Sequence, residues 1–586
     1  MRARSEDFAY WFASAVPLAH LSRSARLLAD VGAFVDHILA SQAASGWLGP
    51  ANADTDGNGE WARWPVLAGL LHWREATGDA RILPAVLAHL AESFRRLSSA
   101  GPLGGNWAGS RWQDYAYIIE WVLDIVGEAD AERTRFLVNM LWTVYGQQSV
   151  DWEQWFTPSF FPTGNTGWNY SAHGVNTAQA LKSGAVVFRM SGSRSAAQSS
   201  FDRLALLDRY HGAPTGVFQA DETLSDGMPS HGTELCAVVE SIFSLNVVHE
   251  IQGGASFADR AERIAYNALP ATWTSDMMGH QYLQQANAVN ALHQDDHVWL
   301  ADGPDATTFG LAPNYPCCAA NGPQGWPRLV SRMALATPDG GVALAILGPF
   351  TATTAGGVTV TVRTEYPFGD ALDIVVSNAP PGFPLYVRVP GWARAANFTL
   401  NGGAAAAMAN GTMQRIALAG AAGGDAVHVE LNPAVAVAAM YNGALAVSRG
   451  ALVYGVRLGE AVNVTATHAC PAPDHPAVPD FTVNSTTPWN LALVVDPTAA
   501  DLSPYLRFAR AGALNATQPF DHAAPPLQIA AMARLLPAWG LEHGSAAPPP
   551  ASPACAAGSC GPPFPVTLVP VGFTHLRMSV LPWTPT

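Results

Sequence analysis

The stretch ARILPAVLAHLAESFRRL (residues 80–97) carries apolar side chains at helical spacing. Leu83, Leu87, Leu90, Phe94 and Leu97 recur every three or four residues, which places them on one face and predicts an amphipathic helix over 80–97. Segments with the same helical spacing of apolar residues lie on both sides of this stretch. The further predicted helices are 24–42, 61–77, 111–127, 131–145, 174–190 and 234–250. The chain from about residue 20 to about residue 270 is therefore predicted to be a succession of helices.

Short segments rich in glycine or proline separate these helices. They are Gly46–Gly49, Gly101–Gly105 and Thr157–Gly167. Many helices in one block indicate either a solenoid or a closed double ring of helices. The sequence shows no fixed repeat period, and a solenoid would be expected to have one. We therefore predict a closed α/α toroid for residues 1–335.

The pattern of apolar residues changes after about residue 335 from helical periodicity to that of strands. Short β-branched segments follow, bounded by clusters of glycine, proline and asparagine. These segments are Val342–Leu347, Val358–Val362, Leu385–Val389, Val427–Leu431 and Val566–Pro570. They predict an all-β region made of two β-sandwich domains, 336–440 and 441–586. Within the second domain, the Pro- and Ala-rich stretch 541–565 is predicted to be a surface loop.

Composition and charge narrow the range of partners. A net charge of -15 over 586 residues disfavours nucleic acid and anionic membrane surfaces, because both would repel the chain. No run of 18 apolar residues is present, so no membrane span is predicted. Six N-x-S/T sequons favour a secretory context, although the N-terminal segment MRARSEDFAYWF has no signal-peptide hydrophobic region. We expect a secreted protein whose export signal is not in this chain. The oligomeric state stays open.

The cysteines suggest a metal site. Six cysteines are too few for a disulfide framework in a chain of this size, and Cys555 and Cys560 are either a local disulfide or free thiols. Adjacent Cys317 and Cys318 are poorly placed to bridge each other, but both can reach one metal ion. Zinc prefers four ligands drawn from thiolate, imidazole and carboxylate. Two further ligands are therefore needed.

Glu234 and Cys236 are candidates for these two ligands. Residues two apart project to nearly opposite sides of a regular helix, so both can bind one ion only at an irregular helix start. Gly232 and Thr233 place a helix start there. The alternatives are an N-terminal helix carboxylate for Glu234 and a small core residue for Cys236. Spacing alone leaves both interpretations open.

These residues resemble a known family. Thr-Glu-Leu-Cys (233–236) followed by Pro-Cys-Cys (316–318) resembles glycoside hydrolase family 127, the β-L-arabinofuranosidases and their relatives. Further similar motifs are His-Gly-Val-Asn at 173–176, Gln-Gly-Trp-Pro-Arg at 324–328, Tyr-Pro-Phe-Gly-Asp at 366–370, Leu-Tyr-Val-Arg-Val-Pro-Gly-Trp-Ala at 385–393 and Leu-Val-Pro-Val-Gly at 568–572. In the last motif Val571 stands where the family usually has tyrosine. The resemblance extends from about residue 20 to the C-terminus.

The resemblance implies a fold and a chemistry. It implies an (α/α)6 barrel followed by β-sandwiches, and a Zn²⁺ ion bound by Glu234, Cys236, Cys317 and Cys318. It also implies that Cys317 is the nucleophile of a retaining exo-glycosidase that removes terminal β-L-arabinofuranose, or a related sugar, from glycans. Retaining hydrolysis needs a nucleophile and an acid/base on opposite faces of the anomeric carbon. A thiolate held by the metal would replace the usual carboxylate nucleophile.

The acid/base residue departs from the family pattern. The ungapped match falls on Phe218, so Glu222 is the candidate only if the loop shifts, and Asp221 is the second choice. The alternative is that both carboxylates are solvated loop residues.

Four further residues are expected to bind substrate. His173 would donate to a sugar hydroxyl or, alternatively, hydrogen-bond to the backbone at a helix start. Trp168 offers an indole ring for stacking on a sugar, although most tryptophans pack helices. His231 is three residues before Glu234 and can orient the metal ligands. Tyr315 precedes the cysteine pair.

Three other hypotheses remain at this stage. The same barrel can act on another furanose or pentose. The protein can be an inactive carbohydrate-binding or structural member of the family whose zinc only braces the loops. A two-carboxylate glycosidase or lyase is also possible, because fold does not fix chemistry, and it would use a pair such as Asp295 and Asp296.

Overall fold

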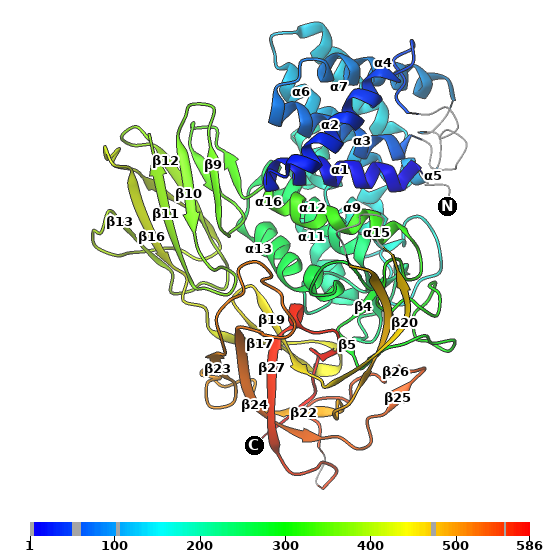
Figure 1. Ribbon diagram of the computed structural model, residues 1–586, viewed down its shortest axis with the longest axis vertical. Coiled ribbons are helices and arrows are strands. Elements are labelled where there is room, and N and C mark those ends of the chain that lie inside the picture. The colour runs from blue at the N-terminus through cyan, green and yellow to red at the C-terminus, as the bar shows by residue number, and fades with distance from the viewer. Residues whose placement is uncertain are drawn as a thin grey trace.

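Figure 1 shows the computed structural model, which describes residues 5–49, 60–100, 103, 106–469, 476–555 and 558–585. A helical region comes first and a β-rich region of several sheets follows, so the predicted fold class is confirmed. In Figure 1 the helices α1 to α7 lie at the top, the sheets with β9 to β13 lie to the left, and the C-terminal sheets lie below.

Most of the predicted helices are present within a few residues of their predicted bounds. They are α2 (Ala25–Ala40), α3 (Trp64–Thr77), α4 (Ile82–Ala100), α6 (Trp112–Val126), α7 (Ala131–Gly146) and α12 (Leu235–Gln252). Further helices are α5 (Asn106–Ser110), α8 (Trp152–Trp155), α11 (Arg194–His211), α13 (Ala255–Arg263), α14 (Leu269–Thr272), α15 (Cys317–Asn321) and α16 (Gly325–Val330). Of the predicted apolar face, Leu90 and Leu97 are buried, and the other three residues are partly buried and pack against the core. Val86, which lies outside that predicted set, is also fully buried.

The segment 174–190 was predicted as one helix and is in fact two. It forms α9 (Gly174–Ala180) and α10 (Ser183–Ser191), separated at Leu181 and Lys182. The Lys182 ammonium is fully buried, forms an ion pair with Asp114 and donates to the Ser244 hydroxyl at 3.2 Å. A buried ammonium needs such partners, and these contacts occur at the break between the two helices.

A helix that the periodicity did not indicate opens the chain. Helix α1 (Ser5–Ser22) packs on α3, α15 and α16, and its Phe12 and Val16 are fully buried. The first helix that the periodicity predicts is 24–42. Apolar residues occur on most sides of α1, so it lacks the amphipathic stripe by which helices were recognised.

Helix α12 is the core helix of the helical region. Among the described residues it is the one helix long and apolar enough to cross a membrane, and 78% of that segment is buried inside the protein. A helix that is apolar all round is expected at the centre of a large helical domain as well as in a membrane. Its burial here explains its composition.

The middle region consists of two sheets whose inner faces are buried. One sheet has the order β14-β13-β16-β11-β10-β9, and the other has the order β15-β12-β8-β7. Their bounds are β7 (Ala334–Ala336), β8 (Val342–Leu344), β9 (Phe350–Thr353), β10 (Thr359–Arg363), β11 (Ala371–Ser377), β12 (Pro384–Val389), β13 (Asn397–Leu400), β14 (Ala406–Ala407), β15 (Thr412–Ala417) and β16 (Asp425–Glu430). Alternate residues of β11, among them Leu372 and Ile374, are buried, as in a strand with one face on a core.

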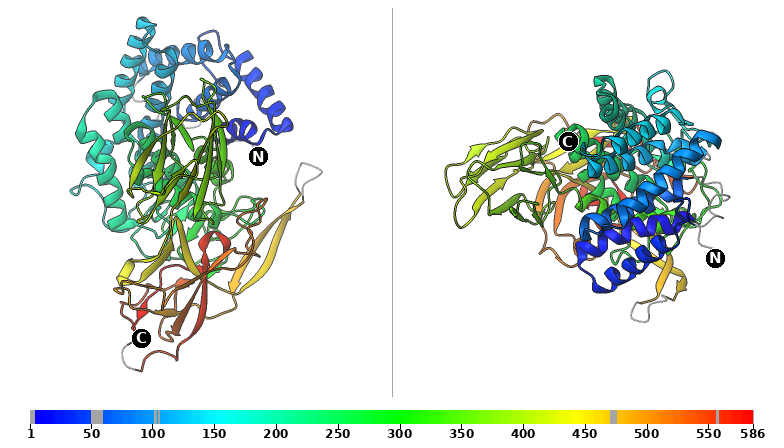
Figure 2. Two further views of the ribbon diagram at one scale, coloured as in Figure 1. Left: turned by 90° about the vertical axis from the view of Figure 1, so that its left-hand side faces the viewer. Right: turned by 90° about the horizontal axis from the view of Figure 1, so that it is seen from above.

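The C-terminal region forms a ten-stranded sheet that includes a strand of the helical region. Its strands are β17 (Val435–Ala439), β18 (Leu445–Arg449), β19 (Leu452–Arg457), β22 (Leu491–Val494), β23 (Arg507–Arg510), β24 (Leu527–Leu535), β27 (Phe564–Pro570), β28 (Arg577–Met578), β29 (Trp583–Thr584) and β5 (Asn287–Ala288). A three-stranded sheet joins β20 (Glu460–His468), β21 (Val478–Ser485) and β6 (Asn290–Ala291). The part of the ten-stranded sheet that lies in the C-terminal region starts with β17 at Val435. The pairing of β28 with β5, and of β21 with β6, connects the C-terminal sheets to the helical region. The long hairpin of β20 and β21 projects from the body of the molecule (Figure 2, left).

The stretch 541–565 is not entirely the surface loop that its composition predicted. It contains a short hairpin, β25 (Leu541–Glu542) and β26 (Ser545–Ala546), and a disulfide between Cys555 and Cys560. Ser545 and Ala546 are buried, because the Ser230 hydroxyl donates to the Ala546 carbonyl. A Pro- and Ala-rich composition does not reveal such packing against a distant segment.

A buried histidine in α4 predicts a pH-dependent stability. His89 is fully buried, accepts a hydrogen bond from the Leu48 amide at 3.2 Å and stacks on Trp47. Burial, followed by the charges of Arg63 and Arg96, lowers the pKa of His89 to about 3. The folded protein therefore keeps this imidazole neutral, whereas an unfolded chain protonates it below about pH 6.5. The stability that it contributes is complete above pH 6.5 and is lost as the pH falls toward 3.

We expect His89→Gln to weaken this pH dependence. Between pH 7 and pH 5 the wild-type chain should lose about 2 kcal/mol of unfolding free energy through His89 alone, and the variant should not. Urea unfolding of both proteins at the two pH values measures the difference. His37, exposed on α2, provides the matched control in His37→Gln. Equal pH dependence in all three proteins would contradict the prediction.

Candidate active site

Two distant segments bring four metal-ligand side chains together. Strand β3 (Gly232–Glu234) ends at Glu234, whose backbone is extended with φ -65° and ψ 137°, and α12 begins at the next residue. Cys236 lies in the first turn of α12, and Cys317 and Cys318 open α15. The predicted irregular helix start is therefore present.

The distances between these side chains are those of a ligand cluster. Glu234 Oε1 lies 3.8 Å from Cys317 Sγ and 3.6 Å from Cys318 Sγ, and the sulfur atoms of Cys236 and Cys318 are 3.4 Å apart. This sulfur separation is far longer than a disulfide bond, and the three thiols are free. One ligand atom from each of the four residues lies within 4.8 Å of all the others. Three sulfurs and a carboxylate oxygen can hold a metal ion.

Burial and hydrogen bonding distinguish Cys317 from the other ligands. Burial raises the pKa of Glu234, Cys236 and Cys318 well above their ordinary values. Hydrogen bonds from the thiols of Cys236 and Cys318 lower the pKa of Cys317 well below its ordinary value. Cys317 is also the one partly exposed thiol of the three. It is therefore the sulfur best suited to act as an ionised nucleophile.

Glu222 lies beside this cluster. It sits between β1 (Ala220–Asp221) and β2 (Thr223–Leu224) with φ 62°, and Ala220 of β1 pairs with Thr233 of β3. This turn brings carboxylate oxygens of Glu222 and Glu234 within 4.8 Å of each other. Phe218, the residue at the ungapped position, is buried and does not line the cavity, whereas Glu222 does.

Two neighbours fix the orientation of the Glu222 carboxylate. The Tyr282 hydroxyl donates to Oε2 at 2.5 Å and lies 3.8 Å from Cys317 Sγ. The backbone amide of Asn176 donates to His173 Nδ1, so Nδ1 is an acceptor and a neutral ring carries its proton on Nε2. His173 Nε2 lies 3.3 Å from Glu222 Oε1. His173 thus caps α9 and faces Glu222 through its other nitrogen. Tyr282 was not among the expected site residues.

These side chains surround a cavity of about 220 Å³. Its walls come from α1, the start of α6, α9, β3, α12 and α15. The lining residues are Glu6, Tyr10, Trp107, Arg111, His173, Val175, Glu222, Glu234, Cys236, Tyr315 and Cys317. Tyr315, which is 43% exposed, lines the cavity. Trp168, which is 50% exposed, is not a lining residue, but its ring centroid lies 5.1 Å from that of His173, which is one. Glu6, Tyr10 and Arg111 were missed, because no motif marks them and only the packing of α1 and α6 brings them here.

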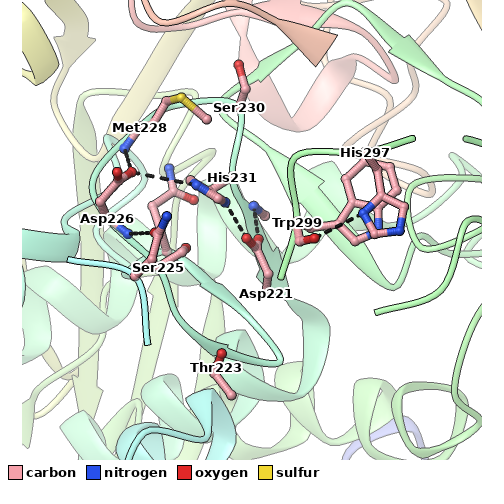
Figure 3. Close-up of polar contacts among 12 residues, drawn as sticks. Asp221, Thr223, Ser225, Asp226, Met228, Ser230, His231, His297 and Trp299 are labelled. Atoms are coloured by element: carbon pink, nitrogen blue, oxygen red, sulfur yellow. Dashed lines mark hydrogen bonds and ion pairs between the residues drawn. The ribbon is translucent and has the colours of Figure 1, made fainter. Parts of the chain in front are cut away.

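His231 belongs to a neighbouring cluster rather than to the cavity wall. Figure 3 shows its ring between Asp221 and Asp226, and Asp221 also accepts a hydrogen bond from the Gly232 amide. Burial alone would lower the pKa of His231, but the charge of Asp221 raises it above its ordinary value. Asp221, the second choice for the acid/base, is fully buried and bonded to His231 and Gly232. Both residues brace β3 and therefore the position of Glu234.

The carboxylate pair Asp295 and Asp296 does not form a second site. Their side chains are 92% and 80% exposed, and they contact His293 and His543 respectively. Neither residue lines the cavity. The arrangement therefore offers no support for the hypothesis of a glycosidase or lyase that uses this pair.

Comparison with known proteins shows a match to one family in the middle region and a shared fold over nearly the whole chain. The family model of the middle domain of GH127 β-L-arabinofuranosidases matches residues 342–432. Three solved structures share the fold over nearly the whole chain, although no curated protein matches the sequence. One glycoside hydrolase has a TM-score of 0.68 and 13% identity, and the match covers 99% of this chain and 92% of that one.

Two of these structures are GH127 enzymes. A GH127 β-L-arabinofuranosidase from Geobacillus stearothermophilus T6 has a TM-score of 0.65 and 16% identity, and the match covers 99% of this chain and 90% of that one. A second GH127 β-arabinofuranosidase has a TM-score of 0.62 and 15% identity, with 98% and 88% covered. At these identities the structural likeness shows a common fold, consistent with a helical barrel followed by β domains.

Proposed function

We propose that this chain is a retaining exo-glycoside hydrolase of glycoside hydrolase family 127, which the middle-domain match and the shared fold support. Its proposed substrate is terminal β-L-arabinofuranose, or a related sugar, on a glycan. The observation that supports this most directly is that Cys317 and Glu222 both lie close to one hydroxyl group, that of Tyr282, which donates to Glu222 and is 3.8 Å from Cys317 Sγ. A nucleophile and an acid/base are thus held together at one small cavity.

The size of the cavity supports action on a single terminal sugar. Its volume of about 220 Å³ is below the roughly 300–1,000 Å³ of pockets that hold drug-sized ligands. The aromatic rings of Trp107 and Tyr315 line it, and such rings stack on the apolar faces of sugars. Half-exposed Trp168, which contacts Trp107 and His173, is suited to contact the group that leaves.

The proposed reaction has two steps. In the first, Cys317 Sγ attacks the anomeric carbon, the glycosidic C–O bond breaks, and protonated Glu222 gives its proton to the leaving oxygen. In the second, the Glu222 carboxylate takes a proton from water, the water oxygen bonds to the anomeric carbon, and the C–S bond breaks. The thiolate and the acid return to their starting states, and two inversions retain the configuration. His173 and Tyr282 hold Glu222 in place for both steps.

The four-residue cluster fits zinc in type, number and burial. Three thiols and one carboxylate are a ligand set that zinc accepts, and Glu234 Oε2 is a buried oxygen with no hydrogen-bond partner among the described residues. When bound, zinc would supply the positive charge that keeps buried thiols ionised. Glu234, Cys236, Cys317 and Cys318 would hold it.

Hydrolysis of a panel of 4-nitrophenyl furanosides and pyranosides tests the proposed activity. We expect cleavage of the β-L-arabinofuranoside, and proton NMR of the first product should show the β anomer. Cleavage of only another pentoside would change the sugar but keep the class of enzyme. Absence of turnover on every sugar of the panel, with metal bound, would favour the inactive carbohydrate-binding member instead.

Glu222→Gln tests the acid/base assignment. We expect kcat to fall by about 10²- to 10⁴-fold for alkyl or sugar leaving groups, because these need a proton. The first step on a 4-nitrophenyl glycoside should be much less affected, and azide should restore turnover of that substrate as the glycosyl azide. Glu128, exposed after α6, supplies the control Glu128→Gln. An unchanged kcat for the sugar leaving group would remove Glu222 from the mechanism.

A further inference from the structure

Arg111 is a buried cation at the wall of the cavity. It lies just before α6, is 3% exposed, and lines the cavity together with Glu222 and Cys317. Its guanidinium lies over the rings of Trp61 and Trp107, with distances of 4.1 Å and 4.7 Å from Cζ to the ring centroids. The side chain is therefore confined between two indoles.

One hydrogen bond fixes the position of this guanidinium. Arg111 Nε donates to Asn176 Oδ1 at 2.7 Å. The Asn176 amide nitrogen in turn donates to the Tyr170 carbonyl at 2.9 Å and to the Ser110 hydroxyl at 3.2 Å, which determines which way the amide points. The motif at 173–176 thus places two groups of the cavity, Glu222 through His173 and Arg111 through Asn176.

Arg111 has a hydrogen bond left to make. Its Nη1 is buried and has no partner among the described residues. An unsatisfied buried donor is rare in native proteins, and a guanidinium that has been desolvated and immobilised loses more than a neutral group does. A ligand oxygen in the cavity would satisfy this donor.

The other residues that line the cavity indicate which kind of ligand oxygen would accept this hydrogen bond. Among the lining residues Arg111 is the one arginine or lysine, and the rings of Trp107 and Tyr315 line the same cavity. Such rings stack on the apolar faces of sugars, so the oxygen expected beside Nη1 is a sugar hydroxyl.

We propose that Arg111 is a specificity-determining residue that donates a hydrogen bond from Nη1 to a hydroxyl oxygen of the sugar in this cavity. This inference rests on the proposed function, since it names a further sugar-binding residue of the same site. It assigns Arg111 to binding and not to the chemical steps.

Binding of a glycoside that resists cleavage tests the inference without relying on turnover. Methyl 1-thio-β-L-arabinofuranoside and glucuronic acid are titrated by calorimetry into the metal-loaded wild-type protein and into Arg111→Lys and Arg111→Met. We expect Arg111→Met to weaken binding of the thioglycoside by about 10- to 100-fold, because a hydrogen bond to a charged group is lost. Arg111→Lys should weaken binding of the thioglycoside by about tenfold. A lysine has a single ammonium group in place of the planar guanidinium, which donates to Asn176 through one nitrogen and to the sugar through another.

Arg449 provides a matched control. It lies over Phe508 at 3.8 Å and forms an ion pair with Asp370 in the β region, away from the cavity. Arg449→Met should bind the thioglycoside as the wild type does. Circular dichroism of each variant checks that it is folded, and Arg111→Lys keeps the test available if Arg111→Met does not fold.

Three outcomes are distinguishable. Wild-type binding that both Arg111 variants retain undiminished would overturn the inference and leave the proposed function intact. Tighter wild-type binding of glucuronic acid than of the thioglycoside, lost in Arg111→Met, would overturn the assignment of a hydroxyl oxygen to Arg111 and favour a carboxylate instead. No binding of either compound by the wild-type protein would instead count against a sugar in this cavity, and therefore against the proposed function itself.

Discussion

Replacing Cys317 with serine is expected to lower kcat for any glycoside that this protein cleaves by about 10⁴-fold or more, which is the scale of losing a catalytic nucleophile. The thiol of Cys317 is the easiest of the three to ionise and the one partly exposed to the cavity. A serine hydroxyl has the same reach but ionises far less readily than a thiol. The substrate should still bind, so KM should change much less than kcat.

Two measurements separate the loss of the nucleophile from the loss of the metal. Metal analysis should be carried out on Cys317→Ser and on Cys318→Ser, because both variants remove one ligand from the same cluster. A haloacetamide derivative of the sugar should then label the wild-type protein at Cys317 and not at Cys318, as located by peptide mass spectrometry. The double variant Cys555→Ser/Cys560→Ser, which opens the remote disulfide, serves as the cysteine control. Hydrolysis by Cys317→Ser at the wild-type rate would remove the nucleophile from the proposal.

Replacing Arg388 with methionine is expected to reduce the unfolding free energy by about 3–5 kcal/mol. Arg388 on β12 is fully buried and forms ion pairs with Asp259 and Glu262 of α13, while its Nε donates to the Ala345 carbonyl at 2.6 Å. Glu262 also accepts a hydrogen bond from the Tyr366 hydroxyl at 2.5 Å. These contacts join the helical region to the middle sheets. Removing the arginine leaves a buried carboxylate without its cation, which costs more than the pair itself contributes.

Urea unfolding followed by tryptophan fluorescence measures this loss. Arg415→Met is the matched control, because Arg415 is half exposed and lies 3.9 Å from Asp339, and an exposed pair of this kind contributes about 0–1 kcal/mol. The double variant Glu262→Gln/Arg388→Met should recover part of the loss, since it removes the stranded charge as well. A loss for Arg388→Met no larger than that for Arg415→Met would show that this buried cluster does not stabilise the contact between the two regions.

Much of the helical region and the residues of the candidate metal cluster could be predicted from the sequence. Helices such as α4 and α6 follow from the spacing of apolar residues, whereas the cluster of Glu234 and the cysteines was implied by the resemblance of their motifs to a family, because spacing alone left it open. The break between α9 and α10 could not be predicted, because it occurs where Lys182 meets Asp114 and Ser244, residues distant in the sequence. Helix α1 was missed because it lacks an amphipathic stripe.

Sequence alone therefore determined the order of helices before sheets, since periodicity is a local property, and the resemblance of short motifs supplied the four residues of the candidate metal cluster. Only the tertiary structure decided that Glu222 and Cys317 both lie beside the Tyr282 hydroxyl and that His231 contacts Asp221 outside the cavity. It also decided that Arg111 lies over two indoles and that its Nη1 has no hydrogen-bond partner among the described residues. The reason is physical: a hydrogen bond between segments far apart in the chain depends on how every helix and sheet between them packs, and no short stretch of residues records that packing.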